Sequence, residues 1–305
     1  MDHKIVELHW QVDESYAGNV LRSYLREEQQ ISKKALADIK FGGGTIKVNG
    51  KEATVRTILH TSDVVSITLP PEIPSDSIIP EDIPLTIVYE DEHVMVINKP
   101  PGMATIPSRE HRTNTLANAV IGYFNREGIS STFHAVNRLD KDTSGLLVVA
   151  KHRLAHDRLS KIQKKGNLSR YYQTIVHGKL ESQTFTIDAP IGRNEESIIE
   201  REVREDGKRA ITHCEVVAEG EQVSFVSVKL ETGRTHQIRV HFAYIGHPLC
   251  GDDLYGGERT FIKRHALHCH QVKFVHPFTG EVLHFQADLP DDMVKVLKSH
   301  SLVFQ

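Results

Sequence analysis

Residues 137–151, NRLDKDTSGLLVVAK, hold two acids and three bases directly before an apolar run. Asp140 precedes TSGLLVVA, and apolar residues at successive positions indicate a strand buried on both faces. A carboxylate at the mouth of such a strand is partly desolvated, so it needs a cation or hydrogen-bond donors to stay ionised. In that state it can act as a nucleophile or a base. Asp142 has a simpler explanation, an Asx-type turn that binds the backbone of residues 143–145.

Two further segments hold residues that could complete such a site. In LETGRTHQIRVHFAYIGHPLCGD, Arg234 and Arg239 lie five residues apart across an expected strand-to-helix junction. Gly233 permits a backbone bend there, and the helix can hold Arg239 rigidly as a cation. In SRYYQTIVHG, Tyr171 and Tyr172 point to opposite faces of one expected strand, because side chains alternate along a strand.

The elements that must position these residues follow from hydrophobic periodicity. Helical spacing predicts helices over residues 115–126 and 153–164 and from residue 235 to Gly246. Alternation predicts strands in SRYYQTIVHG, RAITHCEVV and QVSFVSVKLE and a hairpin in HALHCHQVKFVHPFTGEVLHF. Because strands follow strands and helices are interspersed irregularly, we expect an α+β fold with a mixed, mainly antiparallel sheet and flanking helices.

The N-terminal quarter has its own pattern of elements. Helical spacing covers residues 17–29, and Ser32 is the expected N-cap of a second helix that glycines 42–44 end. An Asn49-Gly50 turn then joins two short strands. The run PPEIPSDSIIPEDIP is rich in Pro and acids, which is typical of a stiff linker. We therefore expect a small domain at 1–70, a linker at 71–84 and a main domain at 85–305.

Composition narrows the possible classes of protein. The 305 residues are 39% hydrophobic and 25% charged, as in a soluble globular protein. The first residues carry charge, no apolar run spans a bilayer, and the three cysteines form no even framework, so we expect a cytoplasmic protein without a membrane partner. Net charge is -3, but residues 151–170 are rich in Lys and Arg. A local positive field can bind phosphates even when total charge is negative, although a charge run can equally be a solvated helix face.

The quoted motifs together resemble a known family. NRLDKDTSGLLVVAK, SRYYQTIVHG and LETGRTHQIRVH, with NKPPGM before and RHALHCHQVKFVHPFTGE after, resemble the large-ribosomal-subunit type of RNA pseudouridine synthase over about residues 86–290. Likewise, ISKKAL and GGGTIKVNGK resemble the alpha-L type RNA-binding domain over residues 14–70, the usual companion in that family. One departure is Asn137, where the commonest family form has His.

The resemblance implies an isomerase that converts uridine to pseudouridine in structured RNA without a cofactor or metal. Asp140 would be the catalytic carboxylate, attacking the sugar or removing a sugar proton, with Arg239 paired to it. Tyr172 would stack on the extracted uracil and Leu267 would pack against its other side. The implied RNA contacts, with Arg138 filling or bracing the vacated stack, are Arg138, Ser32, Lys33, Lys34, Lys40, Arg158, Lys161, Lys164, Lys165 and Arg234.

Several alternatives remain open at this stage. Groups such as His265, His268 and Cys269 could suggest zinc, but their spacing fits no closed tetrahedral pattern. A non-catalytic protein that docks on ribosomal RNA and a hydrolytic N-glycosylase are rivals from other classes, which the behaviour of an Asp140→Asn variant or release of free uracil would identify. For the synthase, ribosomal RNA of the large subunit is the favoured substrate, transfer RNA is the alternative, and we expect a monomer.

Overall fold

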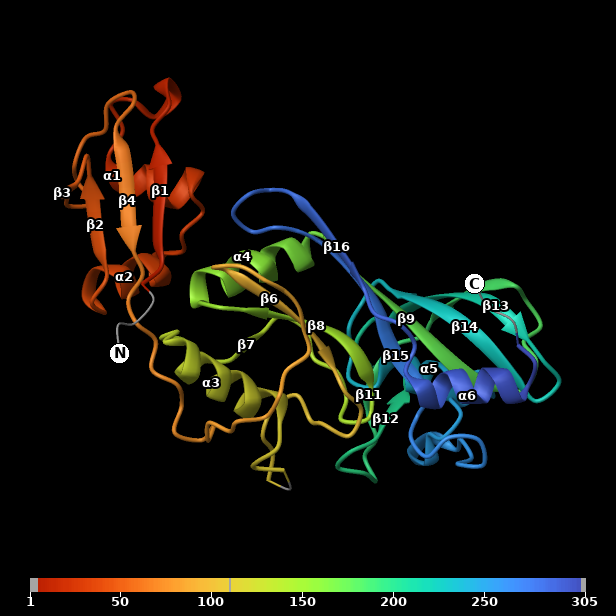
Figure 1. The fold of residues 1–305 in the computed structure, drawn as a ribbon. Helices are drawn as coiled ribbons and strands as arrows, with labels where there is room; N and C mark the ends of the chain where they lie inside the picture. Colours follow the sequence, from red (N-terminus) through yellow and green to blue (C-terminus); the bar gives the residue numbers. More distant parts are fainter. Residues whose placement is uncertain (1–4, 110, 303–305) are drawn as a thin grey trace.

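The computed structural model describes residues 5–109 and 111–302 and contains two main sheets (Figure 1). The N-terminal sheet has the strand order β1-β4-β2-β3, and all of its pairs are antiparallel. Its strands are β1 (Glu7–Gln11), β2 (Thr45–Val48), β3 (Lys51–Glu52) and β4 (Val64–Thr68). Its short helices are η1 (Glu14–Tyr16), α1 (Leu21–Ser23), the π-helical turn η2 (Tyr24–Glu28) and α2 (Lys33–Phe41).

The second sheet has ten strands and carries the main core. Its order is β10-β13-β14-β9-β15-β8-β6-β5, with β7 added beside β8 and β16 beside β15. The strands are β5 (Ile87–Glu90), β6 (Val94–Lys99), β7 (His134–Ala135), β8 (Ser144–Ala150), β9 (Leu168–His177), β10 (Thr184–Asp188), β13 (Ile211–Glu219), β14 (Val223–Leu230), β15 (Leu267–Val275) and β16 (Val282–Gln286). The ribbon β11 (Ile191–Arg193) and β12 (Arg201–Val203) is separate.

The pairing of this sheet confirms the expected fold class. β8 and β15 run parallel, whereas the other strand pairs of the sheet are antiparallel. Gly145 lies at the parallel contact with φ +108, and a Cβ there would collide with the backbone of Cys269. A glycine is therefore required where these two strands meet. The fold is α+β with a mixed, mainly antiparallel sheet.

The helices cover both faces of the ten-stranded sheet. They are α3 (Leu116–Glu127), α4 (Arg153–Lys164), α5 (Gln237–Tyr244), the short η3 (Asp253–Tyr255) and α6 (Asp291–Ser299). On β9, Tyr172 and Val176 belong to the main core together with residues of α3, α4 and α5, whereas Ile175 packs in a second cluster with α6. Because strand side chains alternate, the even-numbered residues of β9 face the same side as α5.

Most of the elements expected from the sequence are present, and the helix at 153–164 has the predicted bounds. The helix expected at 115–126 is α3, which Thr115 caps with Asn118 and which Gly128 ends in the left-handed conformation. The strand β1, the segment β10–β12 and helix α6 were not anticipated. The turn after Asp140 is closed by the Thr143 N–H, which donates to the Asp140 carbonyl (3.1 Å), and not by the expected Asp142 side chain.

The N-terminal elements contact the rest of the chain through α4 (Figure 1). Leu154 of α4 packs in the core of the N-terminal sheet. Arg153 pairs with Asp38 of α2 at 2.7 Å, and its backbone N–H donates to the linker residue Glu72 at 2.7 Å. Glu72 also pairs with His134 at 2.6 Å. The linker is thus bound to the main body at this point, and the domain boundaries at residues 70 and 84 stay predictions.

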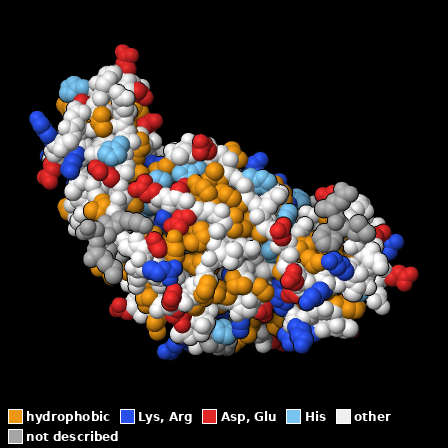
Figure 2. All heavy atoms as spheres, viewed as in Figure 1, with side chains coloured by type: hydrophobic (Ala, Val, Ile, Leu, Met, Phe, Trp, Pro, Cys, Tyr) orange, Lys and Arg blue, Asp and Glu red, His pale blue; other side chains and the backbone are white. Residues whose placement is uncertain are grey.

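The surface has no field of a single sign on the face drawn in Figure 2, where Lys and Arg are interspersed with Asp and Glu. This pattern fits the net charge of -3. Within the described ranges, no helix has the length and apolar character needed to cross a membrane.

Candidate active site

Asp140 lies in the loop between β7 and β8, and this loop is bound on every side. Thr105 accepts from the Leu139 N–H (3.3 Å) and donates to the Leu139 carbonyl (2.6 Å), so the residue before Asp140 is held. After Asp140, the Lys99 ammonium donates to the carbonyl of Lys141 at 3.1 Å and Arg264 to that of Asp142 at 2.9 Å. The backbone of this loop therefore has little freedom to move.

Lys99 is fully buried, which is unusual for a charged side chain. Its three N–H groups reach three carbonyls, those of Pro100 at 2.9 Å, Met103 at 2.8 Å and Lys141 at 3.1 Å. Burial lowers the pKa of Lys99 to about 7, against the opposing effect of Asp142 and Asp140. The NKPPGM segment thus supplies a buried amine that joins two loops, a role that the sequence did not reveal.

The side chains that follow Asp140 are bound to β15 and to the residues just before it. Thr143 is 2.8 Å from Nε2 of His265, and Ser144 is 2.9 Å from Nδ1 of His268. Arg264 binds both carboxylate oxygens of Asp292 in α6, at 2.6 and 2.9 Å. The RHALHCH segment therefore braces the loop that carries Asp140. Among the described residues, no group of three His, Cys, Asp or Glu side chains is arranged to hold a metal ion.

Arg239 meets Asp140 at the floor of the site. Its Nη1 is 3.1 Å from Oδ2 of Asp140, although 99 residues separate the two in the chain. Arg239 also makes a bidentate pair with Asp252, at 2.7 and 2.8 Å, and Asp252 is 1% exposed. A bidentate pair fixes the plane of a guanidinium, so Asp252 orients Arg239 toward Asp140. We call these three residues, Asp140, Arg239 and Asp252, the ionic floor.

The groups next to Asp140 keep its carboxylate charged. Burial alone would raise the pKa of Asp140, but His236 and Arg239 outweigh burial and hold this pKa below its ordinary value. Burial lowers the pKa of His236, so His236 is mostly neutral near pH 7 and the permanent charge is that of Arg239. The side chain of Asp140 is 28% exposed and thus remains accessible from the cavity.

His236 is a second neighbour of Asp140 and adopts the left-handed conformation with φ 57, which is uncommon for a residue other than glycine. Its Nε2 is 3.9 Å from Asp140, and its Nδ1 is 2.8 Å from the hydroxyl of Tyr255. That hydroxyl accepts from the Arg201 N–H at 2.9 Å, so its own hydrogen is directed to Nδ1. This assignment, inferred from the hydrogen-bond network, puts the proton of His236 on Nε2, facing Asp140.

Tyr172 and Leu267 form the apolar part of the site. Tyr172 in β9 is 4% exposed, and Leu267 begins β15 and is also 4% exposed. Burial raises the pKa of Tyr172, so its phenol is neutral. Both residues line an inner cavity of about 50 Å³ together with Asp140 and Arg239. The structure thus brings together the four residues expected at the centre of the site.

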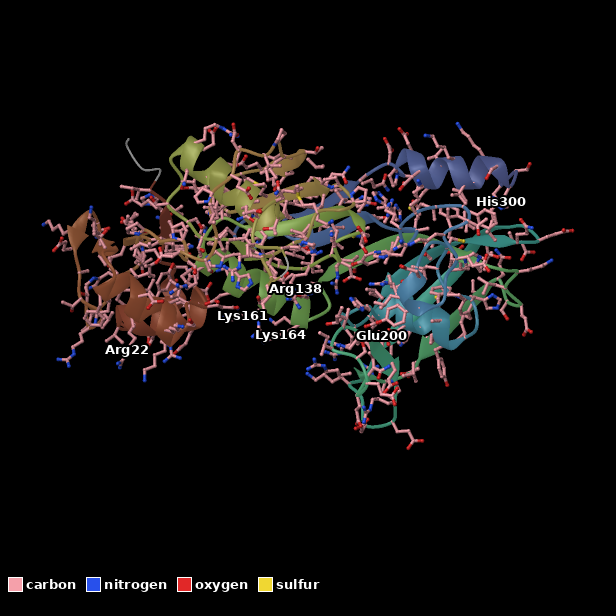
Figure 3. All side chains as sticks on the ribbon, turned by 90° about the horizontal axis from the view of Figure 1, so that it is seen from below. Arg22, Arg138, Lys161, Lys164, Glu200 and His300 are labelled. Carbon is pink, nitrogen blue, oxygen red and sulfur yellow. The ribbon has the colours of Figure 1, made fainter. Side chains whose placement is uncertain are left out.

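An outer cavity of about 510 Å³ lies next to the inner one and shares Asp140, Tyr172 and His236 with it. Arg138 and Arg234 line both cavities and are exposed. Figure 3 shows Arg138 in the middle of the molecule, in the same region of the view as Lys161 and Lys164. The cavity is therefore open to a large ligand, with basic side chains at its mouth.

Two of the residues expected to contact RNA bind other parts of the chain in this structure. The Arg158 guanidinium donates to the carbonyls of Gln29 (2.7 Å) and Pro277 (2.9 Å) and lies over the ring of Phe278. The Ser32 hydroxyl caps α2 by accepting from the Ala35 N–H and faces Asp157. These side chains attach the N-terminal elements to α4, and RNA contact by them stays a prediction.

The remaining basic residues differ in their surroundings. Lys161 donates to the carbonyl of Gln30 at 2.9 Å, which leaves its other two N–H groups available. The other lysines expected to contact RNA are exposed and have no ion pair to a described residue; they are Lys33, Lys34, Lys40, Lys164 and Lys165. For these residues RNA contact stays a prediction.

The chain resembles known proteins over most of its length. A family model described as RNA pseudouridylate synthase matches residues 93–244. An uncharacterised RNA pseudouridine synthase of Bacillus subtilis, YjbO, is 50% identical over 274 residues, which are 90% of this chain and 97% of that protein. The ribosomal large subunit pseudouridine synthase D of Pseudomonas aeruginosa is 38% identical over 270 residues, 83% of each chain.

A solved structure gives the same result for the fold. The human RNA pseudouridylate synthase domain containing 1 aligns with a TM-score of 0.57 and 27% identity, covering 71% of this chain and 86% of that one. The chain therefore belongs to the RNA pseudouridylate synthase family. It is an RNA-modifying isomerase, as the resemblance of its motifs implied.

Proposed function

We propose that Asp140 is the catalytic carboxylate that converts uridine to pseudouridine in large-subunit ribosomal RNA. The observation that carries this proposal is the 3.1 Å contact between Arg239 and Asp140 in a cavity that Tyr172 also lines. A carboxylate held ionised by a fixed cation, yet still accessible, is suited to act on a sugar. His236, with its Nε2 proton facing Asp140, supports the same ionised state.

The reaction is an exchange of bonds within one nucleotide. The bond between N1 of uracil and C1′ of ribose breaks, and a bond between C5 and C1′ forms. The hydrogen on C5 is lost and N1 gains one, so the atoms balance without a cofactor. Asp140 either attacks C1′ and forms a covalent intermediate or removes a proton from C2′. Either route needs one carboxylate at the sugar, and Asp140 is positioned for it.

The detached uracil must be retained while it turns. We assign this to Tyr172 and Leu267, which line the inner cavity from neighbouring strands. A glycosidase that inverts uses a second carboxylate to activate water, whereas a synthase must exclude water so that the base is not released. The target uridine is inside folded RNA, so it must be flipped out at a cost of a few kcal/mol. Arg138 at the cavity mouth is suited to brace the vacated stack.

The choice of substrate rests on the relatives and on the N-terminal elements. The relatives from Vibrio cholerae and Pseudomonas aeruginosa are named for the ribosomal large subunit. We assign RNA binding to the N-terminal domain, with the exposed lysines of α2 on the phosphates, because such contacts position a protein without reading sequence. A ribosomal substrate implies a cytoplasmic protein, and a monomer suffices because one chain supplies the whole cavity.

Tritium release tests the proposal. Purified protein is mixed with large-subunit ribosomal RNA or with transfer RNA, each labelled with tritium on C5 of uracil. We expect release from the ribosomal RNA without added cofactor, followed by detection of pseudouridine at defined positions. Release from transfer RNA alone would assign the other substrate, and release from neither would reject the enzymatic role. Free uracil in the products would indicate hydrolysis.

A further inference from the structure

Two residues that line the outer cavity carry buried hydrogen-bond donors without an acceptor. In residues 5–109 and 111–302, four buried side-chain nitrogens lack a hydrogen-bond partner, and two of them, in Asn137 and Arg170, belong to residues lining this cavity. The other two have charged or polar partners nearby, since His276 is 2.9 Å from Asp91 and Arg158 binds carbonyls through its remaining nitrogens. A buried donor without an acceptor costs about 1–3 kcal/mol, so native proteins rarely retain one without a reason.

Arg170 is half-buried and differs from two buried arginines, Arg239 and Arg264. It lies two residues before Tyr172 in β9, so both side chains emerge from the same face, with their Cα atoms roughly 6–7 Å apart along the strand. Arg239 and Arg264 each donate from Nε and Nη2 to the two oxygens of one carboxylate. The Nε of Arg170, by contrast, is buried without a hydrogen-bond partner, and no carboxylate of a described residue pairs with its guanidinium. Arg170 therefore faces the cavity as an uncompensated cation.

Gly233 lies against this guanidinium. A Cβ at position 233 would be 2.9 Å from Nη2 and 3.3 Å from Nη1 of Arg170, closer than side chains normally approach. Gly233 is not among the glycines with positive φ, so the backbone alone does not demand glycine here. The guanidinium is the far end of a flexible side chain and could move away from such a Cβ at little cost, so the contact places Arg170 beside residue 233 without requiring glycine there.

Asn137 supplies a second donor to the same cavity. It is 5% exposed, and its Oδ1 accepts from the Val148 N–H at 2.9 Å. That bond fixes the orientation of the amide, so its Nδ2 is the free end. A fixed donor and an unpaired guanidinium on one cavity wall call for a ligand with several acceptor atoms and a negative charge. We call these residues, Asn137, Arg170 and Gly233, the donor wall.

Phosphate satisfies both requirements. A guanidinium binds phosphate with two parallel N–H bonds, and arginine is preferred for this contact because its fork is planar and always charged. We propose that the donor wall binds a backbone phosphodiester of the nucleotide whose base enters the inner cavity. The proposal rests on the proposed function, since it assumes that RNA enters beside Asp140. A cation at this position also offsets the repulsion between that phosphate and the Asp140 carboxylate.

Ethylation interference tests this assignment. A large-subunit ribosomal RNA fragment that contains a converted uridine is ethylated on its phosphates about once per molecule, and the bound and free fractions are mapped. With wild-type protein, we expect ethylation at a phosphate adjoining the converted uridine to prevent binding. With Arg170→Met, that phosphate should no longer interfere while the others still do. An unchanged interference pattern would overturn the proposal.

Affinity and stability give independent readouts. Arg170→Met should weaken binding of the same fragment roughly 10-fold or more, since a hydrogen bond to a charged group contributes about 1.5–3 kcal/mol. A plot of log K for RNA binding against log salt concentration should become shallower by the amount that corresponds to about one lost phosphate contact. Arg170→Lys, which keeps the charge, should restore the wild-type slope. Because Met removes an orphaned donor, the melting temperature should stay the same or rise. A lowered melting temperature with an unchanged salt slope would mark Arg170 as merely structural.

Two further variants complete the design. Arg126→Met is the matched control, because Arg126 is an exposed arginine on α3 that pairs with Asp82 outside the cavity. It should leave the interference pattern and the salt slope unchanged. Asn137→Asp keeps an oxygen for the Val148 N–H and replaces the donor with an acceptor, so binding should weaken at the same phosphate. Conversion of uridine in unmodified RNA by wild-type protein tests the proposed function separately, so the two failures are distinguishable.

Discussion

Arg239 lines the inner cavity and Arg170 lines the outer cavity, and their surroundings are opposite. Arg239, in the ionic floor, binds Asp252 through two bonds and Asp140 through a third. Arg170, in the donor wall, has a buried Nε without an acceptor and no ion pair with a described residue. The groups assigned to the chemistry are oriented before RNA arrives, whereas those assigned to the RNA backbone stay unsaturated. Floor variants should therefore lower the rate, and wall variants should lower the affinity.

The largest effect is expected from Asp140→Asn. Removing the carboxylate removes the nucleophile or base, so the rate should fall by roughly 10³-fold or more. RNA affinity should change little, because Asp140 is not part of the donor wall. Single-turnover tritium release and filter binding with the same RNA measure the two quantities. An active Asp140→Asn protein would contradict the assignment of the chemistry to the ionic floor.

A paired substitution in the ionic floor should have the next largest effect. Arg239→Met with Asp252→Leu removes both buried ions, which avoids an uncompensated carboxylate and so limits the loss of stability. Asp140 then stays buried without a cation, so its pKa should rise. In the wild type this pKa lies below its ordinary value, so the charge of Asp140 is lost only in strong acid.

The paired variant should consequently lose activity at a higher pH than the wild type, in addition to a rate loss of roughly 10–100-fold. Single-turnover rates between about pH 5 and 8 measure both effects, because this range lies above the ordinary carboxyl pKa and a raised pKa of Asp140 would titrate within it. If the acid limb of the pH profile does not move, Arg239 is not what keeps Asp140 ionised.

Lys99→Met should mainly affect stability, with a smaller loss of rate. The variant leaves three carbonyls of the Asp140 region without their donor. The free energy of unfolding should fall by about 2–4 kcal/mol, given about 1–3 kcal/mol for each buried group without a partner and partial relaxation. Urea denaturation measures this loss. Lys151→Met is the control, because Lys151 binds Glu90 and the Asp91 carbonyl beyond the far end of β8, and it should retain the wild-type rate per folded molecule.

The smallest effect is expected at the junction with the N-terminal elements. Burial would raise the pKa of Glu72, but His134 and the Arg153 N–H lower it below its ordinary value. The ionised Glu72 thus stabilises the fold above pH 4.5, and this contribution is lost as pH falls through its lowered pKa. Glu72→Gln should lower the free energy of unfolding by about 1 kcal/mol at pH 7 and by less at pH 4. Equal losses at both pH values would contradict this reason.

The fold class and the buried strand after Asp140 were predictable from local sequence, whereas the role expected for Asp140 came from the resemblance of its motif to the family. Asp140 precedes a continuous apolar strand, and α4 is amphipathic with clear ends, so neither depends on distant contacts. Asp252 was missed because it comes from an irregular loop whose sequence has no periodic signal. The segment β10–β12 was missed for a similar reason, since short, half-exposed strands carry weak alternation.

The basic helix shows the limit of charge patterns. Arg158 was assigned to phosphate together with lysines of this helix, yet both Arg153 and Arg158 attach α4 to the N-terminal elements. Charge counts do not distinguish a cation that binds RNA from one that binds a carbonyl of the same chain. Only the packing of α4 against α2 and the turn before it separates them.

By itself, the sequence determined most of the strands and helices, the carboxylate that precedes the buried strand β8, and the placement of Tyr171 and Tyr172 on opposite faces of β9. Those properties follow from backbone periodicity and solvent exclusion over a few residues. Tertiary structure decided which charges are neutralised, giving Arg239 two carboxylates and Arg170 none. The physical reason is that electrostatic pairing depends on distances between side chains from separate segments, which local sequence does not encode.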